Sequence, residues 1–151
     1  MEIENQYVKA WRKSHECKIV SPREVMQLFD YLNTLSWGTS QIDWADTPGL
    51  HIPFEEGDPQ PEWVDNFSST PLGRHKFIMV AYAPDKEALL GDRDEVLADL
   101  DLLYVGAPGA RYFCGADLDQ DRLILSVEDF AEFSDRGVTV HLPDQSTLQQ
   151  Q

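Results

Sequence analysis

A central β-strand is predicted by the stretch KFIMVAY at residues 76–82. This stretch is rich in aromatic and β-branched residues, which favour the pleated, half-buried surface of a sheet. Pro84 follows and marks the end of the strand, because proline has no backbone N–H to donate to a neighbouring strand. The run from Phe77 to Pro84 is also the longest uncharged apolar run. A membrane-spanning helix needs about 20 such residues, so none is predicted.

Two helices are predicted before this strand. Apolar residues recur at helical spacing over residues 3–14, which predicts the first. The second is marked more clearly, because Ser21 fits an N-cap, Pro22 the first helical position and Glu24 a capping box. From Val25 onward the apolar residues recur at i, i+3, i+4 and i+7, which predicts one buried helix face.

Further strands are predicted after residue 100. They cover residues 100–105, 110–114 and 122–125, with turns at 106–109 and 117–121. The pattern Ser126-Val-Glu-Asp129 repeats the capping box and predicts a short helix through Phe133, before a last strand at 138–142.

Helices followed by strands with short turns indicate the α+β class. We expect N-terminal helices packed on an antiparallel sheet of about four to five strands, with a β-meander near residues 100–125. A single domain is expected over residues 1–143 and a disordered tail over 144–151.

Residues 37–73 break the periodicity. They contain three tryptophans, five prolines and four glycines. Residues 51–54 fit an edge strand, because proline cannot donate to a ladder, and one helical turn is expected at 62–67. Long irregular segments of this kind are often binding loops. Trp44 and Trp63 fit two roles, as core anchors beneath the loop or as anchors of a protein interface.

Negative charge is concentrated in the middle of the chain. The net charge is -15, and residues 84–135 alone carry fourteen acids against four bases. Residues 1–36 carry five of each and are neutral. A field of this sign repels nucleic acid and anionic lipid, and it attracts basic surfaces within a Debye length of about 8–10 Å. We therefore expect a cationic protein partner, with neither nucleic acid nor a membrane as partner.

Local motifs for catalysis or metal binding are weak. Asp117, Asp119 and Asp121 alternate as in a calcium loop, but Arg122 replaces the turn glycine, and an acidic turn followed by a capped helix is the favoured explanation of the pattern. The four histidines show no zinc spacing. Cys114 lies in an apolar context that favours a buried thiol, although pairing with a histidine as nucleophile and base stays open. No cofactor is expected.

A resemblance adds to this interpretation. The segment Leu100-Asp-Leu-Leu-Tyr-Val-Gly-Ala-Pro-Gly-Ala-Arg-Tyr-Phe-Cys114, with the step Leu123-Ile-Leu-Ser-Val-Glu-Asp-Phe130, resembles immunity proteins of bacterial polymorphic toxin systems. In one such family a strand ending near Tyr-Val precedes a glycine-containing turn and an aromatic strand. The resemblance implies an α+β protein that binds a nuclease, deaminase or similar toxin in the cytosol of the producing cell, without a cofactor.

Together these observations predict a non-catalytic acidic inhibitor. With two cysteines, no Cys-x-x-Cys motif and no secretory signal at the start, the expected compartment is the cytoplasm. Two alternatives remain, a phage-type protein that imitates DNA, and a small enzyme or calcium-binding module with dispersed site residues. The predicted contact surface comprises eight acids and two tryptophans: Asp85, Glu87, Asp92, Asp94, Glu95, Asp117, Asp119, Asp121, Trp44 and Trp63.

Overall fold

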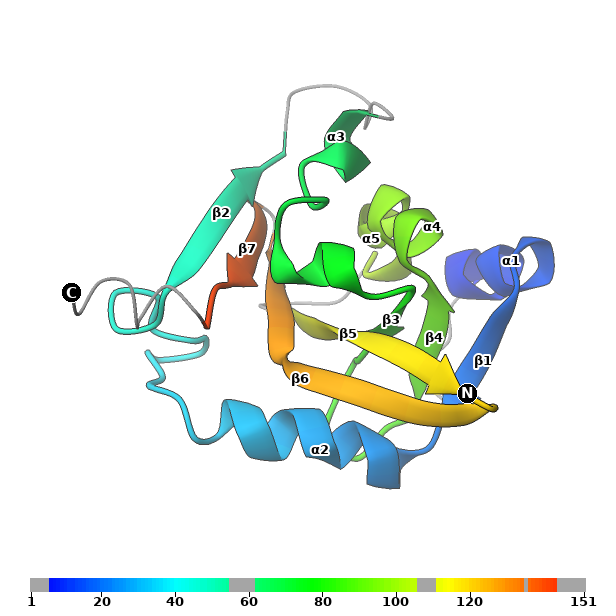
Figure 1. Cartoon of the computed structure of the whole chain (residues 1–151), viewed down its shortest axis with the longest axis horizontal. Coiled ribbons are helices and arrows are strands. Elements are labelled where there is room, and N and C mark those ends of the chain that lie inside the picture. Colours follow the sequence, from blue (N-terminus) through cyan, green and yellow to red (C-terminus); the bar gives the residue numbers. More distant parts are fainter. Residues whose placement is uncertain (1–5, 55–61, 106–110, 135, 144–151) are drawn as a thin grey trace.

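One antiparallel sheet of seven strands forms the centre of the computed structural model (Figure 1). The structure describes residues 6–54, 62–105, 111–134 and 136–143. The strands lie in the order β1-β4-β3-β5-β6-β7-β2. Their bounds are β1 Cys17–Val20, β2 Gly49–Pro53, β3 Phe77–Val80, β4 Ala88–Asp92, β5 Arg111–Asp119, β6 Arg122–Ser134 and β7 Gly137–His141.

Helices cover both faces of this sheet, so the fold has three layers. In Figure 1, α2 lies below the sheet and the other helices lie above it. The helical segments are α1 Gln6–Ser14, α2 Pro22–Leu32, α3 Glu62–Asp65, the 3₁₀ helix η1 Pro71–Arg74, α4 Arg93–Ala98 and α5 Leu100–Leu103. Two apolar clusters result, one on each face, because successive strand residues point to opposite sides.

Helix α2 forms as its sequence predicts. The Ser21 hydroxyl accepts a hydrogen bond from the Glu24 backbone N–H (3.3 Å) and donates one to the Glu24 carboxylate (3.1 Å), which completes the capping box. Val25, Leu28 and Leu32 are fully buried against the sheet. The predicted helix over residues 3–14 is also confirmed as α1, and its first three residues lie outside the described chain.

Several strand predictions are confirmed as well. The stretch at residues 76–82 contains β3, which pairs with β4 and β5 and is therefore central. The predicted edge strand at 51–54 is β2, in which Pro53 stands at the outside of the sheet. The strand expected at 138–142 is β7, and the helical turn expected at 62–67 is α3.

Three expectations are corrected. The α+β class holds, but the sheet has seven strands rather than four to five. Residues 100–103 form helix α5 rather than a strand, because Leu100 and Leu103 bury on one helix face against the apolar cluster. The meander therefore comprises β5, β6 and β7, and does not begin at residue 100.

The third correction concerns residues 126–133. A capped helix was expected there, but these residues belong to the long strand β6, which pairs with both β5 and β7. Residues 131–133 pair with strands on both sides and residues 127–129 form a bulge that joins this ladder to Ser126, so strand pairing outweighs the local capping pattern. The turn expected at 106–109 and the tail at 144–151 lie outside the described residues. Across the described ranges, no helix is long and apolar enough to cross a membrane.

Candidate functional site

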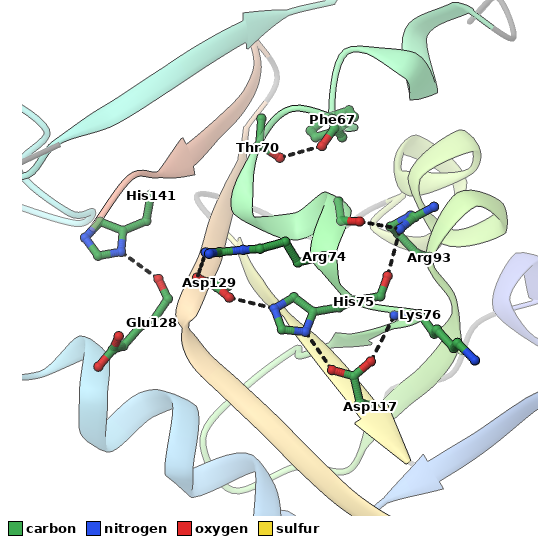
Figure 2. Close-up of polar contacts among 11 residues, drawn as sticks. Phe67, Thr70, Arg74, His75, Lys76, Arg93, Asp117, Glu128, Asp129 and His141 are labelled. Carbon is green, nitrogen blue, oxygen red and sulfur yellow. Dashed lines mark hydrogen bonds and ion pairs between the residues drawn. The ribbon is translucent and has the colours of Figure 1, made fainter. Parts of the chain in front are cut away.

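His75 is held between two carboxylates on the upper face of the sheet (Figure 2). It follows η1 directly, and its ring reaches down toward strands β5 and β6. Nδ1 lies 2.7 Å from Oδ2 of Asp117, and Nε2 lies 2.6 Å from Oδ2 of Asp129. His75 is 8 % exposed and Asp129 is 9 % exposed, so this pair is shielded from water, whereas the Asp117 side chain is 39 % exposed.

The sheet makes room for this ring in two ways. A Cβ on Gly115 of β5 would lie 2.3 Å from Cδ2 of His75, so only glycine allows the ring to sit against the strand. Strand β6 also bulges here. Cys114 pairs with Phe130 but the next residue, Gly115, pairs with Ser126, which leaves three residues of β6 without partners on β5. Asp129 is one of these three, and the bulge directs its carboxylate toward the ring.

Neighbouring groups fix the ends of the cluster. The backbone N–H of Lys76 donates to the second oxygen of Asp117 (3.1 Å). The guanidinium of Arg74 lies 3.4 Å from the second oxygen of Asp129. Arg93 donates from Nη1 to the carbonyls of Gly73 and His75 (2.8 and 2.9 Å), which ties the connection between η1 and β3 to the start of α4.

The two carboxylates favour the cationic form of the ring. Burial lowers the pKa of His75, but the hydrogen bonds and charges of Asp117 and Asp129 raise it by more, so the net direction is upward. For Asp117, burial raises the pKa, while the His75 ring and the Lys76 backbone N–H lower it by more. Ionised carboxylates only accept hydrogen bonds, so two such partners favour the form of the ring in which both nitrogens donate, the imidazolium.

This geometry suits an internal ion cluster better than acid–base chemistry. A general base needs a ring nitrogen that reaches the substrate proton, and both nitrogens of His75 are already bound to carboxylates. Cys114 does not pair with this ring. Its side chain belongs to the opposite face, where it is fully buried, and burial raises the pKa of the thiol to about 12.

The predicted calcium loop takes another form. Asp117 and Asp119 are strand residues of β5, and the turn is made by Gln120 and Asp121, both at positive φ (50° and 67°). Two consecutive residues at positive φ are typical of a type I′ hairpin turn. Asp117 is bound to His75. Among the described residues, no group of three or more His, Cys, Asp or Glu side chains is arranged to hold a metal ion.

The structure divides the eight predicted contact acids between two ends of the sheet. Asp85 and Glu87 lie in the β3–β4 loop, and the full length of β4 separates them from the other six. At the far end, Asp92 pairs with Phe77, which in turn pairs with Ala116 of β5. Two strand spacings, about 10 Å, therefore separate Asp92 from Ala116, and β5 continues three residues beyond Ala116 to Asp119. We define the acidic end as the exposed acids gathered there: Asp92, Asp94, Glu95, Asp119 and Asp121.

The two tryptophans lie elsewhere. Trp63 of α3 is buried, with its ring 4.8 Å from that of Phe67 and 5.5 Å from that of Phe54, so it is a core anchor. Trp44 is half-buried on the α2 face, 5.8 Å from the ring of Phe130. Neither belongs to the acidic end.

A second buried carboxylate was not expected from the sequence. Glu132 is 4 % exposed and accepts a hydrogen bond from the Tyr112 hydroxyl (2.8 Å), which itself accepts one from the Ile42 backbone N–H (3.1 Å). Burial raises the pKa of Glu132. These contacts hold the segment after α2 against the sheet.

Among the site residues that the sequence analysis did not predict, only Gly115 could have been recognised from the sequence, because a glycine inside a strand often marks a close approach of another group to the backbone.

Comparison with protein-family models, with curated proteins and with solved structures finds no match to this chain.

Proposed function

We propose that this chain is a non-catalytic acidic inhibitor, of the immunity-protein type, which binds and neutralises a basic protein toxin through its acidic end. The observation that carries the proposal is the exposure of carboxylates there. Asp119 and Asp121 at the hairpin tip are exposed and make no side-chain hydrogen bond or ion pair with another described residue. Their charge is therefore available to a partner.

The remaining acids of this surface extend it onto α4. The Asp92 carboxylate accepts the backbone N–H groups of Asp94 and Glu95, and so caps the helix. Asp94 contacts Arg93 at 2.9 Å on the surface, where such a pair contributes about 0–1 kcal/mol. A stronger cationic partner can therefore compete for this carboxylate.

The charge pattern also contains bases. Lys76 and Arg122 are exposed near the same end, so the surface is mixed rather than uniformly negative. Ile124 is 39 % exposed on β6 opposite Asp117, which places an apolar side chain beside the acids. An interface of this kind gains association rate from the acids, while the pattern of bases and the apolar contact select the partner.

The test is capture of partners from the native host on two variants of equal net charge. The acidic-end variant replaces four acids: Asp94→Asn, Glu95→Gln, Asp119→Asn and Asp121→Asn. The control variant replaces four exposed acids elsewhere: Asp30→Asn, Asp46→Asn, Asp65→Asn and Asp85→Asn. Asp92 and Asp117 are left in place because they support the fold.

The proposal predicts a basic protein that the unmodified chain and the control variant both capture at low salt and release at high salt. The acidic-end variant should lose it, because the attraction depends on where the charges lie. Equal capture by both variants would show that only the total charge matters, and would contradict this surface. Capture of an enzyme whose toxic activity is not inhibited would contradict the neutralising role.

A further inference from the structure

A pocket of about 780 Å³ lies beside α1 and the edge strand β1. One part of its lining is basic, with Lys9, Arg12 and Lys13 from α1 and Lys18 from β1. Four of the twelve lysines and arginines of this acidic chain therefore surround one pocket. The rest of the lining includes three apolar side chains from β3, β4 and β5, namely Phe77, Leu90 and Leu118.

The fold itself does not need these lysines. Lys13 lies in the last turn of α1, where a cation favours the helix dipole, but Lys9 and Lys18 lie outside that turn. The side chains of Lys9, Lys13 and Lys18 are exposed and make no hydrogen bond or ion pair with other residues that the structure describes. Their charges are therefore available to a bound anion.

The other polar residues of the lining are less available. The His15 ring stacks on Trp11 at 4.2 Å, and its Nδ1 lies 2.8 Å from the Trp11 carbonyl oxygen. Its Nε2 faces Glu95 and Asp99, each at 4.0 Å. Glu16 is the one acid among the described lining residues. Positive charge thus dominates around the pocket despite the net charge of the chain.

Charge and apolar surface lie next to each other here. Lys18 pairs directly with Leu90 across β1 and β4, and paired residues share a face with their Cβ atoms about 5 Å apart. Leu90 is 3 % exposed, while Phe77 and Leu118 are half-buried. A ligand that fits this surface needs an anionic head for the lysines and an apolar body for the leucines and phenylalanine.

We propose that this pocket binds a soluble, single-chain amphiphilic anion of the class of medium-chain acyl carboxylates. Its volume lies within the range of about 300–1,000 Å³ that small-molecule sites occupy. The carboxylate lies among Lys9, Lys13 and Lys18, and the acyl chain lies over Phe77, Leu90 and Leu118. This site goes beyond the proposed function. It adjoins the acidic end, because Leu118 precedes Asp119 in β5 and His15 faces Glu95, but the lysines that would hold the anion belong to α1 and β1.

Cys17 provides a direct test, because it lines the pocket and is partly exposed. The other thiol, Cys114, is fully buried with its pKa raised to about 12, so a maleimide modifies Cys17 first in the native chain. Decanoate below its micelle concentration should slow this modification in a saturable way. Butyrate, which lacks the apolar body, and 1-decanol, which lacks the charge, should each protect much less.

Variants locate the binding groups. The pair Lys9→Gln and Lys18→Gln should weaken decanoate protection by about tenfold, since it removes two charge-assisted contacts. Leu118→Gln should weaken it too, whereas Arg23→Gln on α2 makes the same kind of charge change away from the pocket and should leave it intact. Circular dichroism confirms that each variant is folded.

Three results would overturn the proposal. The first is that decanoate gives no protection of Cys17. The second is equal protection by 1-decanol, or by decanoate in the lysine variants, since the anionic head would then contribute nothing. The third is protection by phosphatidylglycerol vesicles with none by monomeric decanoate, which would assign the basic surface to a membrane.

Discussion

His75 packs against the backbone of Gly115 so closely that a single methyl group should disturb it. Gly115→Ala places a Cβ 2.3 Å from the ring, and the ring cannot move without leaving Asp117 and Asp129. We expect Gly115→Ala to destabilise the chain by about 2 kcal/mol, within the usual range for overpacking. Urea unfolding measures this. Gly38→Ala is the matched control, because its nearest contact is 3.5 Å away, and it should change stability little.

The charge on His75 should appear in the pH dependence of stability. Because its pKa is raised in the folded chain, its contribution is complete below the unfolded pKa of about 6.5 and is lost as the pH rises through the folded value. Below a pH of about 6.5, His75→Gln should lower the free energy of unfolding by about 3 kcal/mol, because it breaks a buried ion cluster. At higher pH the loss should be smaller.

Asp117 sets the lower pH limit at which this cluster stabilises the fold. Its pKa is lowered on folding, so its contribution is present above the unfolded value of about 3.9 and is lost as the pH falls through the folded value. Urea unfolding of the unmodified chain and His75→Gln from about pH 5 to pH 9 tests the upper limit. A stability difference that stays constant, or grows as the pH rises, would show that His75 is not held as a cation.

At the scale of elements, local signals predicted local structure. The capping residues of α2 and the apolar spacing behind them lie within one segment, so the sequence was sufficient there. Pro53 likewise indicated an edge strand. The same reasoning failed at residues 126–129. These residues form a bulge in β6, and Asp129 binds His75, which lies 54 residues earlier in the sequence.

The candidate site was less predictable than the helices. Asp117 and Asp129 lie 42 and 54 residues after His75 in the sequence, and a register shift between β5 and β6 brings the three side chains together. Residue spacing in the sequence cannot predict such a register shift. Six of the eight predicted contact acids are exposed, and Glu87 and Asp117 are half-buried; their role in binding stays a prediction. Their division between two ends of the sheet depends on strand order, which the sequence does not reveal.

The β5–β6 turn gives a prediction at this scale. Gln120 and Asp121 adopt positive φ, which costs L-residues other than glycine about 1–2 kcal/mol each, and less for asparagine. Gln120→Asn with Asp121→Gly is the preferred type I′ pair and should stabilise the chain by about 1 kcal/mol. Thermal unfolding measures the change. As a control, Gln27→Gly at an exposed position within α2 should lower the stability of the chain by about 1 kcal/mol. A loss of stability in the turn variant as well as in this control would contradict the turn assignment.

At the scale of the whole molecule, charges of opposite sign form two neighbouring groups at one end of the sheet. Bases gather around α1 and β1, and the acidic end lies at the hairpin tip and the start of α4. Bases at the acidic end should oppose a basic partner. We therefore expect Lys76→Glu with Arg122→Glu to speed association with such a partner by about tenfold at low salt, with little gain at high salt. Stopped-flow or surface-based kinetics measures this rate.

The most direct test of the acidic end compares association rate constants of the captured partner with the two variants of equal net charge. Each carries four fewer negative charges than the unmodified chain, whose net charge is -15. The account predicts that the acidic-end variant associates about tenfold more slowly at low salt, while the control variant stays close to the unmodified chain. Equal slowing of both variants, or slowing of the control alone, would contradict it.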